Sequence, residues 1–83
     1  MTKIHFVGIG GIGLSALARY LKQEGFEVSG SDVKATKITA KLEAEGISVN
    51  LPHDSHNITD QDLVIYSAVI KDDNVELQES RRK

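Results

Sequence analysis

The chain has 83 residues, with ten basic and twelve acidic side chains and a formal net charge of -2. This length suits one small domain, and 40% hydrophobic residues suffice for a core, which excludes general disorder. The charge balance is not that of a nucleic-acid-binding protein. The lack of cysteine excludes disulfides, thiolate nucleophiles and cysteine zinc sites. No apolar run approaches the roughly 20 residues that span a bilayer, and no signal-peptide pattern precedes the first strand. We therefore expect a cytoplasmic protein without nucleic-acid or membrane partners.

Short apolar segments alternate with helical patterns from the amino terminus onward. Residues 3–7 predict a strand that stops at Gly8, and residues 11–24 place apolar side chains at helical spacing. Gly25 is a favourable helix end, because glycine adopts the left-handed conformation at little cost. Residues 26–30 then predict a second strand.

The same alternation continues through the second half of the chain. Residues 35–45 predict a second helix, and residues 47–49 predict a short third strand. Residues 50–61 are polar and indicate a loop with at most one helical turn. Residues 62–66 predict a fourth strand, apolar enough to be buried on both faces.

A last helix is predicted from the pair Asp73 and Glu76, which has the spacing of a capping box, and from the cations of residues 81–83. The element order predicts an α/β fold, a Rossmann-like half with a four-stranded parallel sheet in the order 3-2-1-4 and flanking helices. A further strand normally follows such a helix. We therefore expect residues 1–83 to form a single domain that is a fragment of a longer protein.

A G-x-G-x-x-G motif joins the first strand to the first helix, with its glycines at Gly8, Gly10 and Gly13. Gly8 allows a tight turn, Gly10 lets an anion approach the backbone, and Gly13 permits close packing of helix and strand. The amides around Gly11 and Ile12 lie at the positive end of the helix dipole and suit a pyrophosphate. Four glycines in six residues exceed what a packing turn needs, so the motif predicts a phosphate-binding loop.

Further candidate residues lie near this loop or at the ends of strands. Asp32 ends the second strand about 20 residues after the loop, where it is suited to accept hydrogen bonds from ribose hydroxyls, to cap a helix or to remain in a loop. Ser15 adds a hydroxyl one turn inside the first helix. Ser31, His53 and Ser67 follow strands whose carboxyl ends meet at one edge, and each is either a ligand contact or an ordinary turn residue.

Other chemistry has little support in the sequence. His53 and His56 lie three positions apart with Asp54 between them, but no further metal ligand has suitable spacing, so no metal site is predicted. The Walker A motif is absent, because Leu14 and Ser15 stand where lysine and serine or threonine belong. No nucleophile triad or carboxylate pair is present, and no catalytic residue is predicted.

Ile4–Ser15 and Val28–Asp32 resemble the amino-terminal domain of the Mur ligases, whose signature runs H-F-x-G-I-G-G-x-G-M-S and then G-S-D. The similarity is greatest to the members that join L-alanine to UDP-N-acetylmuramate in peptidoglycan precursor synthesis. His53, Ser67 and residues 70–74 extend it over almost the whole chain. The chain also departs from the family pattern, with Leu14 for methionine, Pro52 for glycine, Ala68 for serine and Val75 for proline.

The resemblance implies a site for the UDP moiety of UDP-N-acetylmuramate. The glycine loop then faces the diphosphate, and the acid after the second strand lies near the uridine. The implied substrate-binding residues are Gly8, Gly10, Gly11, Ile12, Gly13, Ser15, Ser31, Asp32, His53 and Ser67. ATP, magnesium and L-alanine are implied to bind to a central and a carboxyl-terminal domain outside this chain. The fragment itself is then expected to need no cofactor and to be inactive alone.

Three alternatives remain open from the residues. An NAD-binding domain of a dehydrogenase fits Gly8, Gly10, Gly13 and Asp32 equally well, but leaves Gly11, Ser15 and Ser31 unexplained. A nucleotide-sensing regulatory module uses the same fingerprint. A Mur ligase that recycles cell-wall peptides shares the same amino-terminal signature.

Overall fold

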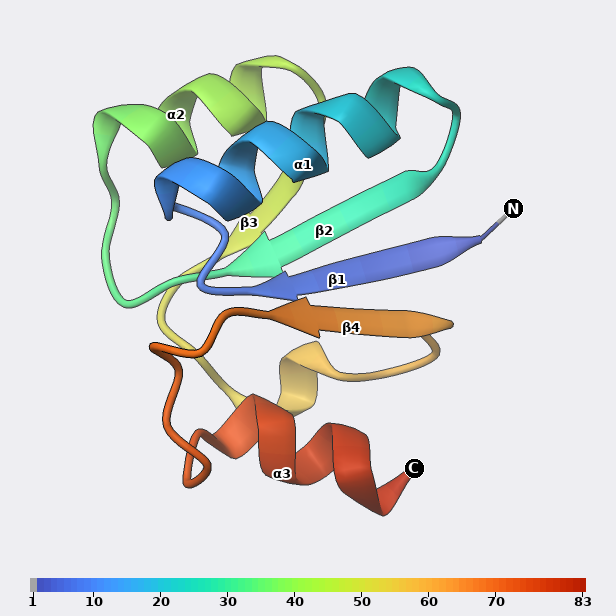
Figure 1. Ribbon diagram of the computed structural model, residues 1–83, viewed down its shortest axis with the longest axis vertical. Coiled ribbons are helices and arrows are strands. Elements are labelled where there is room, and N and C mark those ends of the chain that lie inside the picture. Colours follow the sequence, from blue (N-terminus) through green and yellow to red (C-terminus); the bar gives the residue numbers. More distant parts are fainter. Residues whose placement is uncertain (1) are drawn as a thin grey trace.

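The computed structural model describes residues 2–83, which form one parallel sheet between two layers of helices (Figure 1). Helices α1 and α2 cover one face, and α3 lies with a short 3-10 turn, η1, on the other. The elements in chain order are β1 (Lys3–Val7), α1 (Ile12–Gln23), β2 (Glu27–Ser31), α2 (Lys37–Ala44), β3 (Ser48–Asn50), η1 (Ser55–Asn57), β4 (Leu63–Tyr66) and α3 (Val75–Arg82).

The sheet has four parallel strands in the order β3-β2-β1-β4, which confirms the predicted fold class and strand order. Val7 at the end of β1 is in register with Ser31 of β2 and with Tyr66 of β4, and Ser31 is in register with Asn50. All four strands therefore end at one edge of the sheet, which we call the carboxyl edge. The chain reverses there four times (Figure 1).

The core lies between the sheet and the layer of α1 and α2. Phe6, Ile9 and Leu42 are fully buried in it, and Leu14, Leu21 and other partly buried side chains pack against its rim. Burial of this apolar surface is the main term that holds the helices on the sheet. Helices α1 and α2 end as predicted, because Gly25 and Gly46 follow them with φ of 96° and 89°.

Two predictions about the second half were wrong. Strand β4 is not buried on both faces, because it is an outer strand of the sheet. Its Leu63 and Tyr66 are about half exposed, at 51% and 47%. The N-cap residue of α3 is Asn74, whose side chain accepts hydrogen bonds from the N–H groups of Glu76 and Leu77. Asp73 and Glu76 therefore form no capping box.

Among residues 2–83, no helix combines the length and the apolar composition needed to cross a membrane.

Candidate functional site

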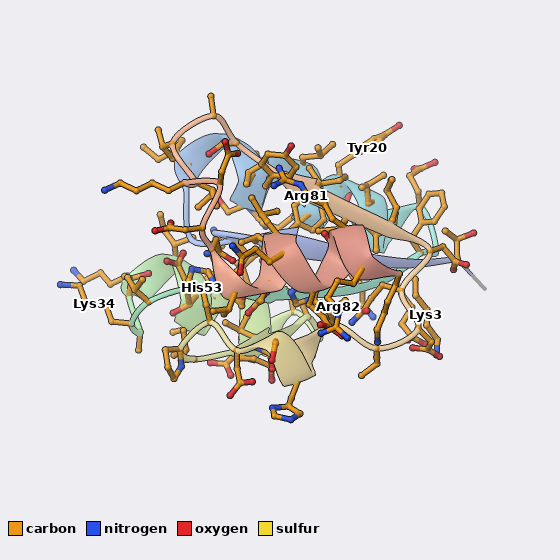
Figure 2. All side chains as sticks on the ribbon, turned by 90° about the horizontal axis from the view of Figure 1, so that it is seen from below. Lys3, Tyr20, Lys34, His53, Arg81 and Arg82 are labelled. Carbon is orange, nitrogen blue, oxygen red and sulfur yellow. The ribbon has the colours of Figure 1, made fainter. Side chains whose placement is uncertain are left out.

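The glycine loop and the segments that follow β2, β3 and β4 meet at the carboxyl edge. Figure 2 shows Lys34, which follows β2, and His53, which follows β3, at one end of the molecule, and Lys3 at the other. Ligands of open parallel sheets bind in this position, outside the carboxyl ends of the strands. The topology thus brings the predicted site residues to one end of the protein.

Residues 8–11 form a tight turn that is bonded to β2. Gly8 has a φ of 85°, which a residue with a side chain rarely adopts, and its carbonyl accepts the N–H of Gly11 at 3.1 Å. The Ser31 carbonyl accepts the N–H groups of Gly8 and Ile9 at 2.9 and 3.0 Å. The path of the glycine loop is therefore fixed by the end of the neighbouring strand.

Helix α1 begins at this turn without a side-chain cap, because its N-cap residue is Gly11. The first amides of a helix have no partner within it and carry the positive end of its dipole. Ile12, the first helical residue, is 84% exposed. The Ser15 hydroxyl is buried and donates to the Ile12 carbonyl at 3.0 Å, so it is turned toward the helix backbone.

Asp32 supports the glycine loop from the side. Its Oδ2 accepts the N–H of Gly10 at 2.7 Å, and its Oδ1 accepts the N–H of Val33 at 2.8 Å. It does not cap α2, whose N-cap is Thr36 in a capping box with Thr39. Both carboxylate oxygens are engaged in the backbone, so the structure gives Asp32 a role in shaping the loop beside any contact with a ligand.

The glycines of the motif differ in their surroundings. A Cβ on Gly10 would come within 2.6 Å of Asp32 Oδ2, whereas one on Gly13 would meet no atom within 4 Å. The motif predicted that Gly13 permits close packing of helix and strand. This prediction is wrong, because Gly13 borders open space. Close packing is instead found at Gly30 of β2, against the glycine loop, where a Cβ would come within 2.6 Å of Ile9 Cβ.

A buried carboxylate beneath the site was not predicted. Glu76 of α3 is fully buried, and its Oε1 accepts hydrogen bonds from Ser31 Oγ at 2.6 Å and His5 Nε2 at 2.7 Å. Its Oε2 accepts the Asn57 side-chain amide at 2.8 Å and the Asp54 N–H at 3.0 Å. This cluster ties α3, two strands and the segment after β3 together.

Burial by itself raises the pKa of the Glu76 carboxyl, because it disfavours the charged form. The hydrogen bonds from His5, Ser31, Asn57 and the Asp54 backbone outweigh that effect and lower the pKa to about 2. Glu76 is therefore a carboxylate at neutral pH. In the sequence, Glu76 is notable only for its spacing from Asp73, which is that of a capping box at a helix start.

The cluster also places two of the predicted residues. Ser31 is fully buried, and its hydroxyl lies 2.8 Å from His53 Nδ1. The His53 side chain is only 13% exposed, and it is held at the carboxyl edge beside the glycine loop by Ser31. Ser31 is thus an interior residue that connects the loop to His53, while His53 reaches the surface.

Ser67 lies in the turn after β4, where its carbonyl accepts the Ile70 N–H at 3.1 Å. The same turn comes close to the glycine loop, because a Cβ on Gly8 would meet Ile70 Cδ1 at 3.0 Å. Ser67 is half-buried, so the fold brings it to the same edge as the loop without tying its hydroxyl to another described side chain.

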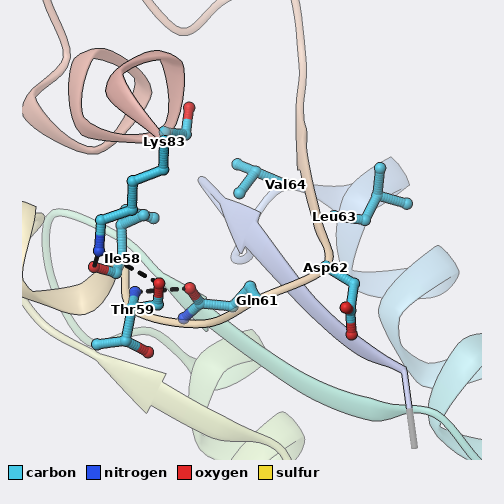
Figure 3. Close-up of a pocket in the computed structure, with 8 residues that line it drawn as sticks. Ile58, Thr59, Gln61, Asp62, Leu63, Val64 and Lys83 are labelled. Atoms are coloured by element: carbon cyan, nitrogen blue, oxygen red, sulfur yellow. Dashed lines mark hydrogen bonds between the residues drawn. The ribbon is translucent and has the colours of Figure 1, made fainter.

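A concave surface of the described chain lies away from the glycine loop. A cavity of about 340 Å³ lies between the end of α3 and the start of β4 (Figure 3). The Lys83 amine closes one side of it by donating to the carbonyls of Ile58 and Thr59 at 3.0 and 3.2 Å. None of the predicted site residues lines this cavity.

Within residues 2–83, no group of three or more His, Cys, Asp or Glu side chains has the arrangement of a metal site. His56 and Asp54 bond to each other on the surface: the His56 Nδ1 and the His56 N–H each lie 2.8 Å from the Asp54 carboxylate.

The sequence model described as "Mur ligase family, catalytic domain" matches residues 3–83. The chain belongs to the Mur ligase family. This confirms the resemblance found in the glycine loop and in the segment ending at Asp32. The Mur ligase chain is 58% identical over 81 residues to a UDP-N-acetylmuramate–L-alanine ligase of Campylobacter jejuni, and 51% identical over 79 residues to that of Helicobacter pylori. The alignments cover 98% and 95% of the chain but only 19% and 18% of these relatives.

Solved structures give the same result. A UDP-N-acetylmuramate–alanine ligase from Thermotoga maritima superposes on 99% of the Mur ligase chain with a TM-score of 0.94 and 45% identity. The UDP-N-acetylmuramate:L-alanyl-gamma-D-glutamyl-meso-diaminopimelate ligase of Neisseria meningitides superposes on 96% of the chain with a TM-score of 0.85 and 35% identity. The chain spans 19% and 25% of these two structures.

Proposed function

We propose that this Mur ligase chain is the amino-terminal, UDP-binding domain of a UDP-N-acetylmuramate–L-alanine ligase that acts in peptidoglycan precursor synthesis. The observation that carries the proposal is the whole-chain similarity to alanine ligases. The TM-score is 0.94 and the identity 45% for the alanine ligase, against 0.85 and 35% for the ligase that acts with a peptide. The family match over residues 3–83 also favours a ligase over an NAD-dependent dehydrogenase or a nucleotide sensor.

The geometry supports a diphosphate at the start of α1. That helix has no side-chain cap, its first residue is exposed, and the space beside Gly13 is open. Backbone N–H groups at a helix N-terminus stabilise bound phosphate groups. In this proposal the phosphates contact the amides of Ile12 and Gly13, because the Gly11 N–H already donates to the Gly8 carbonyl. Asp32 holds the loop in shape through Gly10.

The nucleoside lies along the carboxyl edge in this proposal. His53 and Ser67 reach that edge from either side of the glycine loop, and we assign them to the ribose or the uracil ring. Ser15 and Ser31 have buried hydroxyls that bond within the protein, so we assign them support of the loop and of His53, not direct contact with the ligand.

The described residues do not fit ATP or magnesium, because they contain neither a Walker A loop nor a cluster of acidic ligands. We therefore propose that ATP, magnesium and L-alanine bind to the part of the enzyme that the chain does not span. The 83-residue chain is then expected to bind the nucleotide sugar without ligase activity. We place the enzyme in the cytoplasm, without nucleic-acid or membrane partners.

A two-dimensional NMR titration of the chain with UDP-N-acetylmuramate, and in parallel with UDP and NAD, tests the proposal. We expect UDP and UDP-N-acetylmuramate to shift the amide signals of residues 8–15 and of His53 and Ser67, and NAD to leave them in place. Shifts with NAD alone would support a dehydrogenase domain. No shift with any of the three at millimolar concentration would contradict a nucleotide site within these residues.

A further inference from the structure

The hydrogen atoms around Glu76 can be assigned from its partners. The carboxylate has only acceptor atoms, and four groups donate to it: His5 Nε2, Ser31 Oγ, Asn57 Nδ2 and the Asp54 N–H. A serine hydroxyl has a single hydrogen. Because the Ser31 hydrogen is directed to Glu76 Oε1 at 2.6 Å, Ser31 Oγ has only lone pairs to offer to any other neighbour.

His53 is that other neighbour. Its Nδ1 lies 2.8 Å from Ser31 Oγ, so Nδ1 must supply the hydrogen of this bond. Glu76 Oε2 lies 3.5 Å from the same Nδ1 and favours a hydrogen there as well. A neutral imidazole has one N–H, so the other nitrogen, Nε2, is then an acceptor.

The His53 Nε2 is not fully buried. Within residues 2–83 no buried side-chain nitrogen or oxygen lacks a partner, and no hydrogen bond involves His53 Nε2, so this atom is accessible. Ser31 is also bonded to the glycine loop, because its carbonyl accepts the N–H groups of Gly8 and Ile9. One residue therefore fixes both the loop and the histidine ring.

We propose that Glu76 is a positioning residue for nucleotide binding: through Ser31 it holds a hydrogen on His53 Nδ1, so that Nε2 of the neutral ring accepts a hydrogen bond from an N–H or O–H group of the nucleotide. This inference rests on the proposed nucleotide site. The ligand groups of that chemistry are the uracil N3–H and the ribose hydroxyls. A ligand that offers only an acceptor at this point is rejected, because two acceptors face each other.

The tautomer of His53 is measured on the ligand-free chain, which separates this inference from the proposed function. Two-bond ¹H–¹⁵N spectra of the side chain, recorded at a pH where the ring is neutral, report which nitrogen carries the hydrogen. We expect the protonated type of ¹⁵N shift at Nδ1 and the lone-pair type at Nε2. The reverse assignment would overturn the inference, whatever UDP does.

Glu76→Gln tests the origin of the tautomer. Its amide nitrogen is expected to face His5 and Ser31, because those two groups can reverse their hydrogen bonds and the Asp54 N–H cannot. The Ser31 hydroxyl then donates to His53 Nδ1, and the hydrogen of His53 moves to Nε2. A folded variant that keeps the hydrogen on Nδ1 would show that Glu76 does not determine the tautomer of His53.

Ser31→Ala makes the same test should Glu76→Gln not fold. It removes the nearer acceptor of the His53 N–H and leaves only Glu76 Oε2 at 3.5 Å, so we expect the exclusive Nδ1–H form to give way to a mixture of both tautomers. Ser29→Ala is the matched control: Ser29 lies two residues earlier in β2 and bonds His5 Nδ1 at 2.9 Å, away from His53. Ser29→Ala should leave the His53 tautomer unchanged. If both variants changed the tautomer equally, Glu76 would not act on His53 through Ser31.

Nucleotide analogues identify the donor. UDP, 2′-deoxy-UDP and 3-methyl-UDP are titrated into the chain, and the analogue that lacks the bonded hydrogen should bind roughly tenfold more weakly, as expected for the loss of one hydrogen bond. UDP should also move the ¹⁵N shift of His53 Nε2. Equal affinity of all three ligands without that shift would overturn the contact. Failure of UDP itself to bind would refute the nucleotide site and leave the tautomer result to stand or fall on its own measurement.

Discussion

The backbone N–H of Gly10 donates to Asp32 Oδ2 at 2.7 Å, and a Cβ on Gly10 would lie 2.6 Å from that same oxygen. The close approach that the glycine allows is therefore an approach of the protein's own carboxylate. Asp32 lies 22 positions further along the chain, so the loop and the end of β2 form one unit. This relationship changes what is expected when either residue is replaced.

Asp32→Ala is expected to weaken the binding of UDP and of free pyrophosphate alike, by about tenfold, because it releases the loop that carries the phosphate-binding amides. A contact with the ribose alone, one of the roles that the sequence allows for Asp32, would weaken only uridine ligands. Calorimetric titration with both ligands compares the two. The exposed Asp73→Ala is a control with the same change of charge. A loss confined to UDP would instead assign Asp32 to the nucleoside.

Gly13→Ala separates binding from stability. A Cβ at this position meets no atom within 4 Å, and replacing a glycine in a helix stabilises it by up to about 1 kcal/mol. We expect the free energy of unfolding to stay the same or to rise, and UDP affinity to fall at least tenfold, because the methyl group enters the space proposed for the diphosphate. Unchanged affinity would remove Gly13 from the site.

Gly10→Ala is the companion variant, in which both quantities should fall. The added methyl group would meet Asp32 Oδ2 at 2.6 Å and Thr39 Cγ2 at 3.3 Å, and relieving that contact displaces the loop. We expect the free energy of unfolding to decrease by about 1–3 kcal/mol, measured by urea denaturation, with loss of UDP binding. A variant with wild-type stability would show that the loop accommodates a side chain.

Gly30→Ala is expected to destabilise the fold without involving the ligand. The methyl group would overlap Ile9, with 2.6 Å to its Cβ, and overpacking of this kind costs about 1–3 kcal/mol. In the double variant with Ile9→Ala the combined loss should be smaller than the sum of the single losses, because the truncated side chain makes room. Additive losses would show that the two positions do not compete for space.

The Glu76 cluster predicts a loss of stability in acid. The pKa of Glu76 is lowered from 4.5 to about 2, because the hydrogen bonds from His5, Ser31, Asn57 and Asp54 outweigh the effect of burial. Because the pKa is lower in the folded state, the Glu76 carboxylate contributes its full stabilisation at pH values above the unfolded pKa of 4.5. This stabilisation is lost as the pH falls from 4.5 toward 2. The free energy of unfolding should therefore decrease by about 3 kcal/mol over that interval.

Urea denaturation between pH 6 and pH 2 measures this dependence. Glu76→Gln lacks the titrating group, so its curve should be flatter over the same interval and lower at neutral pH. Glu43→Gln, which removes an exposed carboxylate from the surface of α2, should keep the slope of the parent chain. If both variants showed the same slope, the acid sensitivity would come from groups other than Glu76.

Local sequence patterns predicted the elements and their order, because each depends on neighbouring residues. The strand at residues 3–7, the helix ends at Gly25 and Gly46, and the parallel order 3-2-1-4 are all confirmed. The glycine motif also placed the loop correctly at the start of α1. Its individual glycines were harder to assign, since the role of close packing fell to Gly30, outside the motif.

The partners of Glu76 could not be predicted in this way. The residues of the cluster are spread from His5 to Glu76, 71 positions apart, and no periodicity connects them. The spacing of Asp73 and Glu76 is that of a capping box. In the structure Asn74 is the N-cap residue, and the Glu76 side chain lies in the interior.

The sequence by itself determined the α/β fold, the family and the end of the sheet at which the candidate site lies, because strand order and loop position follow from local preferences and the handedness of the connections. Only the tertiary structure decided how the site residues act. It turned Asp32 toward the glycine loop, buried Ser31 and placed the Glu76 carboxylate beneath His53. The physical reason is that a buried charge must find its hydrogen-bond donors wherever the folded chain supplies them, regardless of their distance in sequence.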